Sequence, residues 1–347
     1  MRASHSFLCD LCLSVVNLFL FLPQTTDPMT LSDSSLIPCP SSMPDYMRRG
    51  TLLLDSAMET LRRGSVAIGM DEIVLGSKQL RDEDETLWRT FVAEQCRAHP
   101  IASLLQEDPF TRRSLEKPRG YTGDPEMFEF IFSPHRRAAT LDEMAREIFH
   151  YTTDGPAPRS VRARAAMTAR LVDTLAEKKP LRALGIMSGH LWEAGMSSAT
   201  RSGRVEKYVA FDGDPRALAT IDAAGYGPGL TTYQGSIRSI IRGRSVFRNF
   251  DFVYSGLCDN LSDPMADHFI AGLVEALAPG GTLLLSNFAP SLVDIGYMEA
   301  FMDWNLNYRD EAQLLDLVES AAAGRLESMR TYRDPHGNIV FVEAVGR

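Results

Sequence analysis

The chain has 347 residues, of which 44% are apolar and 23% charged, and its net charge is −9. This composition is typical of a soluble globular protein with one large domain, or one domain and an extension. The acidic balance argues against a nucleic-acid-binding protein, which needs clustered Lys and Arg to neutralise phosphates. The five cysteines are scattered, which argues against a metal site and favours reduced thiols in a cytoplasmic protein.

The first 46 residues differ in character from the rest. Phe7–Pro23 is strongly apolar, and the stretch that follows it to about Pro44 is rich in Ser, Pro and Thr. We expect residues 1–46 to be disordered, or to result from a start codon placed too early, with Met47 as one alternative start. A membrane anchor is the second interpretation of the apolar tract, and a signal peptide is the third.

Residues 47–178 are expected to form a helical lid. Asp82–Val92 carries its apolar residues at helical spacing. The segment Lys117–Asp124 is too rich in Gly and Pro for a helix, and its polar side chains make it either a functional loop or a simple corner. A second break covers Asp154–Pro158, after which Ser160 is expected to cap a helix that runs to about Lys178.

Residues 179–347 alternate short apolar strands with helical segments, which predicts an α/β domain with a parallel sheet of the Rossmann type. The expected strands are Leu181–Met187, Tyr208–Phe211, Leu230–Tyr233, Asp251–Tyr254 and Thr282–Asn287. The segments between them are Leu191–Arg201, Pro215–Ala223, Ile237–Ile241 and Pro264–Leu277. Pro279-Gly-Gly281 is expected to turn the last helix into the last strand of this series.

The C-terminal pattern distinguishes this sheet from that of a dinucleotide dehydrogenase. Leu326–Arg333 and Asn338–Val345 are two strands joined by Asp334-Pro-His-Gly, which predicts a hairpin and an antiparallel strand at the edge of the sheet. A parallel sheet finished by such a hairpin is the layout of class I methyltransferases that use S-adenosyl-L-methionine (SAM).

The first of the expected strands ends in a turn that could hold this cofactor. Ala183–Glu193 forms a strand, a tight turn and a helix start, and Gly189 would let the backbone approach a ligand. The usual motif is acidic-x-Gly-x-Gly-x-Gly, and here Gly185, Met187 and Leu191 replace three of its four key residues. Taken alone, this segment fits a plain strand-to-helix turn equally well.

Asp212 is the strongest single indication of a nucleoside cofactor. It ends the second expected strand, roughly 20 residues after the turn at Gly189, where a carboxylate can accept hydrogen bonds from both ribose hydroxyls. Asp214 is expected to cap the next helix instead, with Pro215 at its first position. Further along, Gln234–Arg238 could read the adenine edge, and the tail of the fourth strand, Ser255–Asp259, would reach the same site.

Residues 96–345 resemble a bacterial group of class I SAM-dependent methyltransferases. The group includes hydroxy-fatty-acid methyl ester biosynthesis proteins and azetidine-2-carboxylate synthases. Three regions carry the likeness: His99–Arg113 with Lys117–Asp124, Ser188–Glu193, and Gly296–Arg309. In the second region this chain has Ser-Gly-His-Leu-Trp-Glu where the group typically has Cys-Gly-His-Leu-Arg-Glu. The resemblance implies SAM as cofactor and leaves the substrate open, because the group is chemically mixed.

The site residues expected from these patterns fall into two sets. Cofactor binding is expected from Arg119, Gly185, Ser188, Gly189, Glu193, Asp212, Gly213, Ser236, Ile237, Ser255 and Leu257. Catalytic roles are expected for Tyr121, His190, Trp192 and Tyr151. Arg119 would meet a carboxylate of SAM or of an acceptor, and the aromatic rings, with Trp304, would hold the sulfonium by their faces.

The chemistry of the expected site leaves three functions open. The first is methyl transfer to a small molecule, in which a hydroxyl or amine acceptor would need His190 or His150 as base, while a carboxylate or thioether would not. The second is a cyclisation, in which the amino group of SAM attacks its own γ-carbon and methylthioadenosine leaves. The third is a SAM-binding regulator without catalysis.

Overall fold

The computed structural model describes residues 42–347. Most of the expected tail, including Phe7–Pro23, lies outside the described residues, but its end is corrected by the structure. Helix α2 begins at Met43, not at Met47. Tyr46 is fully buried, and its hydroxyl donates a hydrogen bond to the carbonyl of Leu80 at 2.7 Å. The folded chain therefore includes residues that the sequence assigned to the tail.

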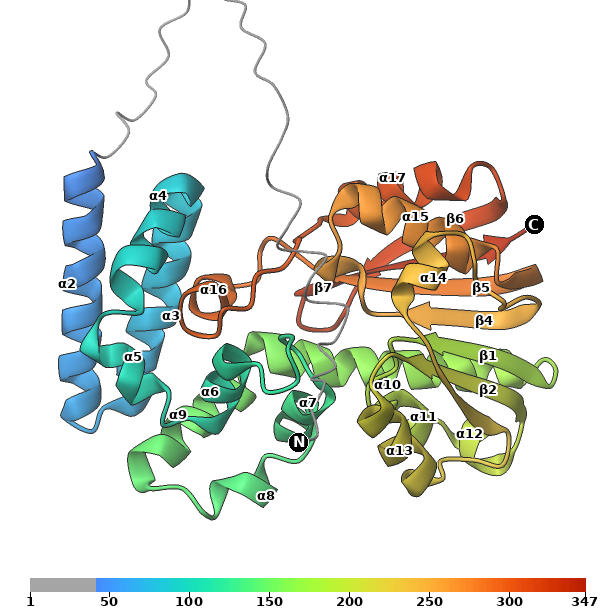
Figure 1. The fold of residues 1–347 in the computed structure, drawn as a ribbon, viewed down its shortest axis with the longest axis horizontal. Coiled ribbons are helices and arrows are strands. Elements are labelled where there is room, and N and C mark those ends of the chain that lie inside the picture. Colours follow the sequence, from blue (N-terminus) through green and yellow to red (C-terminus); the bar gives the residue numbers. More distant parts are fainter. Residues whose placement is uncertain (1–41) are drawn as a thin grey trace, which may run out of the picture.

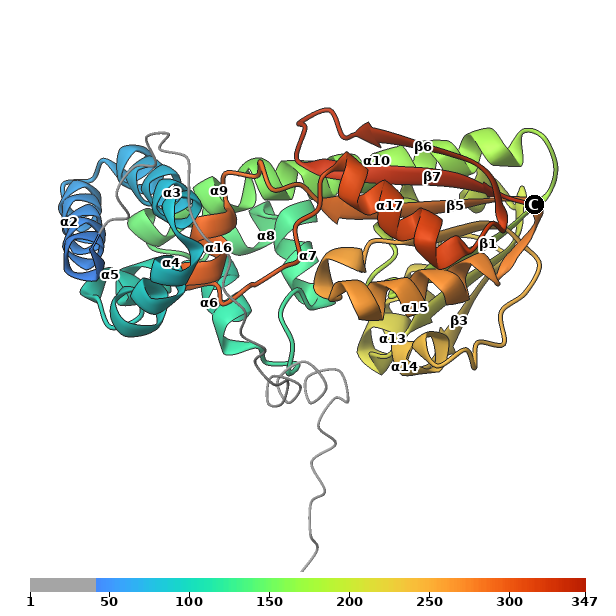
Figure 2. The ribbon, with the colours of Figure 1, turned by 90° about the horizontal axis from the view of Figure 1, so that it is seen from above.

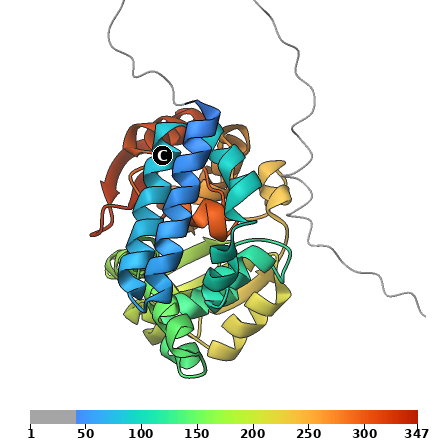
Figure 3. The ribbon, with the colours of Figure 1, turned by 90° about the vertical axis from the view of Figure 1, so that its left-hand side faces the viewer.

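The lid is helical, as predicted, and lies beside the sheet (Figure 1). Its first two helices pack side by side as a pair at one end of the molecule (Figure 3). The lid helices are α2 (Met43–Arg62), α3 (Val66–Glu83), α4 (Glu85–Phe91) with the π-helix η1 (Val92–Cys96), α5 (Pro100–Leu105), α6 (Pro109–Glu116), α7 (Pro125–Phe132), α8 (His135–Ala138), α9 (Glu143–Thr153) and α10 (Pro156–Ala176).

Two Asp-Pro pairs begin the helices on either side of the predicted loop, and the second pair, Asp124-Pro125, ends that loop. Asp108 and Asp124 each accept hydrogen bonds from two backbone N–H groups of the following helix, and a proline occupies the first helical position.

The start of α10 differs from the prediction. It begins at Pro156, so Ser160 is an interior residue whose hydroxyl accepts a hydrogen bond from Asn338 at 3.1 Å. Prolines are tolerated in the first turn of a helix, where their missing N–H costs nothing.

The sheet has seven strands in the order β3-β2-β1-β4-β5-β7-β6. The strands are β1 (Leu181–Ile186), β2 (Val205–Asp212), β3 (Leu230–Gln234), β4 (Phe250–Ser255), β5 (Leu277–Phe288), β6 (Leu326–Arg333) and β7 (Ile339–Gly346). β1 to β5 are parallel, and β7 pairs antiparallel with both β5 and β6. The predicted hairpin is confirmed, but the reversed strand β7 lies inside the sheet and β6 forms its edge.

The helices of this domain cover both faces of the sheet (Figure 2). They are α11 (Trp192–Met196), α12 (Ser198–Ser202), α13 (Pro215–Ala224), α14 (Ile237–Ile241), η2 (Cys258–Asn260), α15 (Asp263–Val274) and α17 (Glu311–Ala322). The remaining helix of this part of the chain, α16 (Ile295–Phe301), packs against α3 of the lid instead. The single helix expected over Leu191–Arg201 is two helices, because Ser197 is extended and caps α12. The helix expected to reach Leu277 ends at Val274, and α17 was not predicted.

Each face of the sheet has its own apolar core. Neighbouring residues of β1 point to opposite faces, so Ala183 packs toward α10 to α13 and Leu184 packs toward α14, α15 and α17. The first of these cores continues without a break into the lid, where it includes Trp88 and Phe149. The lid and the sheet domain are therefore parts of one packed body.

The connection between β5 and α17 leaves the sheet and enters the lid. Its helix α16 crosses α3 so closely that a Cβ on Gly296 would lie 2.5 Å from the carbonyl carbon of Ser77. Glu299 of the same helix accepts hydrogen bonds from the indole of Trp88 at 2.7 Å and from Arg81 at 3.2 Å. These contacts hold the chain that follows, including Trp304, between the lid and the sheet.

Candidate cofactor site and active site

A cleft of about 560 Å³ lies where the carboxyl ends of β1, β2 and β4 face the lid. This volume is within the range of small-molecule pockets, and the position is where open α/β sheets bind ligands. The cleft brings together most of the residues that the sequence singled out. Those on its wall are Tyr121, Ser188, Gly189, His190, Trp192, Glu193, Asp212, Ile237 and Leu257.

The turn after β1 keeps its tight geometry with few glycines. Met187, Gly189 and Leu191 all have positive φ angles, between 54° and 55°. Two of these residues carry a side chain and are strained in this conformation, at a cost of roughly 1–3 kcal/mol each. Ser188 closes the turn, because its hydroxyl donates a hydrogen bond to the carbonyl of Gly185 at 2.9 Å. A backbone turn that usually needs glycines is therefore formed here by a different sequence.

Asp212 lies at the carboxyl end of β2, on the wall of the cleft, and is 3% exposed. Its two carboxylate oxygens accept hydrogen bonds from the backbone N–H of Gly189 at 2.8 Å and of Asp214 at 2.9 Å. Burial raises the pKa of Asp212, and the two N–H donors oppose this shift. The carboxylate is thus oriented in the cleft and retains lone pairs for a ligand. Asp214 caps α13, with Pro215 at its first position, as predicted.

Arg119 does not take the position that the sequence analysis assigned to it. Its guanidinium is bonded to Asp214 and, at 2.6 Å, to Glu126, and it does not line the cleft. Two protein carboxylates balance its charge, so the expected pairing with a ligand carboxylate is corrected. The Arg119–Asp214 pair instead fixes the 117–124 loop to the end of β2. Tyr121 of this loop lines the cleft, and its hydroxyl donates to Asp214 at 3.3 Å.

Aromatic side chains form one side of the cleft. The ring of Trp192 stacks on that of Phe132, with centroids 4.6 Å apart and planes 15° from parallel. Trp304 reaches the cleft from the β5–α17 connection and lies so close to Gly123 that a Cβ there would be 3.0 Å from the indole. Tyr151 differs from the expectation, because it lines a separate cavity within the lid. Its hydroxyl donates a hydrogen bond to Asp71 of α3 at 2.6 Å.

His190 lies on the cleft wall with a carboxylate behind it. Its Nδ1 is 2.8 Å from a carboxylate oxygen of Glu129, and its Nε2 is buried without a hydrogen-bond partner. In this arrangement the carboxylate orients the imidazole ring. His150 is absent from the cleft wall.

Three ionisable residues on the floor of the cleft complete its charge pattern. Burial raises the pKa of Glu193 to about 7 and that of Asp259 to about 6, and Arg164 opposes both shifts. Arg164 lines the same cleft as these two carboxyl groups. The sequence analysis missed this residue. Arg164 lies on the same face of α10 as the buried residues Val161 and Thr168. A charged residue at helical spacing on a buried face was the pattern in the sequence that could have identified it.

Besides Arg119, four of the expected cofactor residues do not line the cleft. Gly185 lies within β1, and Gly213 lies behind Asp212, although both are next to the site in sequence. Ser236 caps α14 by accepting the N–H of Arg238 at 3.3 Å. Ser255 is fully buried and donates to the carbonyl of Ile186 at 3.1 Å. These residues support the strand ends, which is why their positions in the sequence resemble those of binding residues.

Within residues 42–347, no group of three or more His, Cys, Asp or Glu side chains could hold a metal ion. None of its helices is long and apolar enough to cross a membrane. Cys96 and Cys258 are free and buried, and burial raises the pKa of both thiols to about 12, which makes them poor nucleophiles.

Comparison with solved structures finds similar folds at low sequence identity, whereas no family model and no curated protein matches the chain. A possible exported protein from Bordetella parapertussis is 15% identical, covers 88% of this chain and 99% of its own, and has a TM-score of 0.53. A TehB-like SAM-dependent methyltransferase from Corynebacterium glutamicum is 14% identical, covers 65% of this chain and 100% of its own, and has a TM-score of 0.40.

At these identities the likeness shows the fold alone. The strand order, with β7 reversed between β5 and β6, agrees with the layout predicted from the sequence. A helical lid lies beside this sheet (Figures 1 and 2), and a cleft lies at the carboxyl ends of its strands. The chain has the Rossmann-like fold of the class I methyltransferases, with a helical N-terminal lid.

Proposed function

We propose that this protein is a SAM-dependent methyltransferase that acts on a small molecule. The observation that carries the proposal is Asp212, a buried carboxylate at the end of β2 that faces a cleft of suitable size. When bound, SAM supplies a methyl group on a positively charged sulfur, so the leaving group is already activated. The protein then contributes mainly by holding the reactants in line.

Several residues of the cleft fit the parts of this cofactor. Asp212 can accept both ribose hydroxyls, since its two oxygens retain lone pairs beside those that accept backbone N–H groups. Arg164 has the charge for the carboxylate of the methionyl end, and Glu193 has the charge for its ammonium group. The faces of Trp192 and Tyr121 suit the sulfonium, because a cation is attracted to an aromatic ring.

Unpartnered buried groups around the cleft support ligand binding. The Nε2 of His190, the Nε1 of Trp192 and the Nε1 of Trp304 are all buried, and none has a hydrogen-bond partner within the described chain. A buried polar atom without a partner costs roughly 1–3 kcal/mol, and a bound ligand would relieve that cost. His190, oriented by Glu129, can take the proton from a hydroxyl or amine acceptor at its Nε2.

The proposal extends to the enzyme subgroup and to the cellular role of the protein. The resemblance of the three sequence regions supports a role in secondary metabolism or signal synthesis, near the hydroxy-fatty-acid methyl ester and azetidine-2-carboxylate proteins. The aromatic side of the cleft, formed by Phe132, Trp192 and Trp304, favours cyclisation of SAM as the second candidate, since it could hold a folded methionyl chain. The buried free thiols of Cys96 and Cys258 fit a cytoplasmic location.

Two measurements test the proposal. Titration calorimetry with SAM and S-adenosylhomocysteine should give binding of both, and absence of binding to the folded protein would overturn it. Incubation with SAM alone then separates the reactions. Release of methylthioadenosine would indicate cyclisation. If SAM stays intact, an acceptor screen should produce S-adenosylhomocysteine, and binding without any turnover would identify a regulator.

A further inference from the structure

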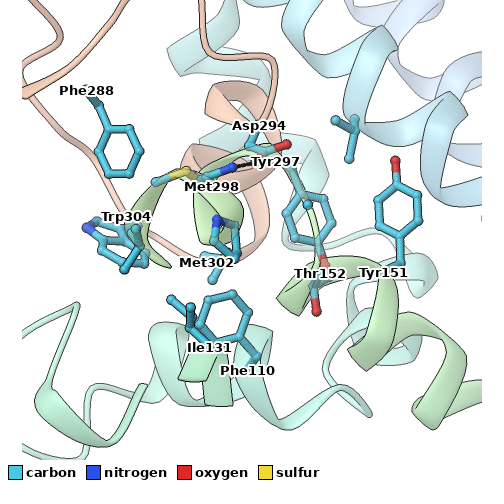
Figure 4. A pocket seen from close by; sticks show the side chains of 15 residues that line it. Phe110, Ile131, Tyr151, Thr152, Phe288, Asp294, Tyr297, Met298, Met302 and Trp304 are labelled. Atoms are coloured by element: carbon cyan, nitrogen blue, oxygen red, sulfur yellow. Dashed lines mark hydrogen bonds between the residues drawn. The ribbon is translucent and has the colours of Figure 1, made fainter. Parts of the chain in front are cut away.

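A second cavity lies inside the lid, next to the cofactor cleft. We call it the inner chamber, and the side chains around it are drawn in Figure 4. Phe110 and Ile131 lie on one side, Met298 lies opposite them, and Tyr151 and Trp304 mark its two ends (Figure 4). Its volume is about 40 Å³. At roughly 10–15 Å³ for each water-sized group, there is room for about three or four heavy atoms.

The polar groups around the inner chamber are directed to partners in the protein. The hydroxyl of Tyr151 donates to a carboxylate of α3 at 2.6 Å, and that of Tyr297 lies 2.8 Å from the hydroxyl of Thr111. Thr152 donates to the buried carboxylate of Asp108 at 2.9 Å. With these groups satisfied, the chamber presents mostly apolar surface to an occupant, and an uncharged apolar group is the matching chemistry.

Asp294 is the one charged residue on the chamber wall. Its Oδ2 accepts the backbone N–H of Ala157 at 2.6 Å, at the N-terminus of α10, where the positive end of the helix stabilises a carboxylate. No basic side chain lines the chamber. An anionic group would therefore meet a carboxylate without a compensating cation, so the chamber disfavours acids.

The inner chamber and the cofactor cleft share three wall residues, Val161, Phe288 and Trp304. Two of them come from the sheet domain and its β5–α17 connection, so the chamber adjoins the place where a methyl acceptor would lie. A substrate could extend from the cleft into the chamber past the indole of Trp304. The small volume excludes a long acyl chain.

We propose that the inner chamber is the subsite for a short, uncharged apolar group of the methyl acceptor, about three or four carbons in size. The proposal rests on the proposed function, because it assigns the reacting end of the same substrate to the cofactor cleft. It predicts acceptors with a small alkyl group and without a charge at that end. Each methylene buried there should tighten binding roughly threefold to fourfold.

Met298 and Met302 line the chamber and provide a direct probe. In protein labelled with ¹³C at the methionine methyl groups, 1-butanol should shift both signals saturably, with its four carbons in the chamber and its hydroxyl toward the cleft. The variants Met298→Leu and Met302→Leu assign the two signals. 1-Propanol should bind roughly threefold to fourfold more weakly, and butyrate at least tenfold more weakly. If 1-butanol moves neither signal, or if butyrate or butylammonium binds more tightly than 1-butanol, the proposal is overturned.

Variants on α3 provide a matched pair. Val74 is 4% exposed and lines the chamber, whereas its neighbour Leu75 is 56% exposed on the outer face. Val74→Phe should abolish the response to 1-butanol, and Leu75→Phe should leave it unchanged. Because Val74→Phe could impair folding, Met298→Ala serves as the opposite change. It enlarges the chamber, so Met302 should now report tighter binding of 1-hexanol than of 1-butanol.

The two proposals can fail separately. If SAM does not bind but 1-butanol shifts Met298 and Met302, the proposed methyl transfer is wrong, and so is the chamber's role as an acceptor subsite. If SAM binds and Val74→Phe and Leu75→Phe respond alike to 1-butanol, only the chamber assignment is wrong. Confirmation requires SAM binding, the 1-butanol response, and its loss in Val74→Phe alone.

Discussion

Replacing Asp212 with alanine tests the assignment on which the proposed cofactor rests. The carboxylate is 3% exposed and oriented by two backbone N–H groups, so it is available to a ligand without rearrangement. Alanine removes the charged acceptor that we assign to the ribose hydroxyls. It also leaves the N–H groups of Gly189 and Asp214 without a partner, but this loss affects the free and bound protein alike and largely cancels in the binding free energy.

The size of the effect follows from the two hydrogen bonds that the ribose would lose. Hydrogen bonds to a charged group contribute roughly 1.5–3 kcal/mol each, and water can replace part of this once the carboxylate is gone. We therefore expect Asp212→Ala to weaken SAM binding by about 1–3 kcal/mol, which corresponds to a dissociation constant roughly fivefold to 150-fold higher. S-adenosylhomocysteine shares the ribose, so it should lose affinity by the same factor.

Asp251→Ala is the matched control. Asp251 also accepts a backbone N–H, that of Arg182 at 2.9 Å, but it lies at the opposite end of the sheet from the cleft. Calorimetry should show unchanged SAM affinity for this variant, and circular dichroism should show that both variants are folded. If folded Asp212→Ala binds SAM within twofold of the unmodified protein, the ribose assignment of Asp212 is refuted.

Three further predictions concern the aromatic rings, the cleft floor and the N-terminus. Trp192→Leu and Tyr121→Leu should each weaken SAM binding by about 0.5–2 kcal/mol and leave the affinity for S-adenosylhomocysteine unchanged, because that analogue lacks the cation. If calorimetry shows equal losses of affinity for both ligands, the rings contribute only packing. Because the pKa of Glu193 is raised to about 7, its carboxyl group ionises as the pH rises from 5.5 to 7.5. SAM affinity should therefore rise up to about tenfold over this range. A Glu193→Gln variant with the same pH dependence would contradict the role of Glu193. A chain that starts at Met47 lacks buried Tyr46, so its free energy of unfolding should be about 3 kcal/mol lower than that of a chain that starts at residue 42. Equal thermal melting temperatures of the two chains would show that the first turn of α2 is dispensable.

The α/β alternation and the C-terminal hairpin could be predicted from sequence because each strand and helix carries its own hydrophobic period. The order of the strands within the sheet could not be predicted completely from the sequence. The hairpin pattern of β6 and β7 does not say which of the two strands pairs with β5. The structure shows that β7 does, and seven of its residues, Ile339–Val345, pair with Thr282–Phe288. The helix start at Asp214 and Pro215 could be predicted, whereas that of α10 could not, since Gly155 caps it without a side-chain hydrogen bond.

The candidate site shows the same division. The position of Asp212 at the end of a strand and of Gly189 in the preceding turn follow from the local pattern, because strand ends of a parallel sheet meet at one edge. Arg119 and Tyr151 could not be placed in this way. Their side chains carry the right chemistry, but which carboxylate or cavity they meet depends on how the lid packs.

The sequence alone therefore determined the fold class, the edge of the sheet where the cleft lies, and the position of Asp212 at that edge, since all three depend on short-range periodicity and chain direction. Only the tertiary structure decided that Arg164 faces Glu193 and Asp259 in the cleft, that Glu129 orients His190, and that the inner chamber adjoins the cofactor site. These contacts join residues far apart in the chain through the packing of the lid on the sheet, and no local pattern encodes that packing.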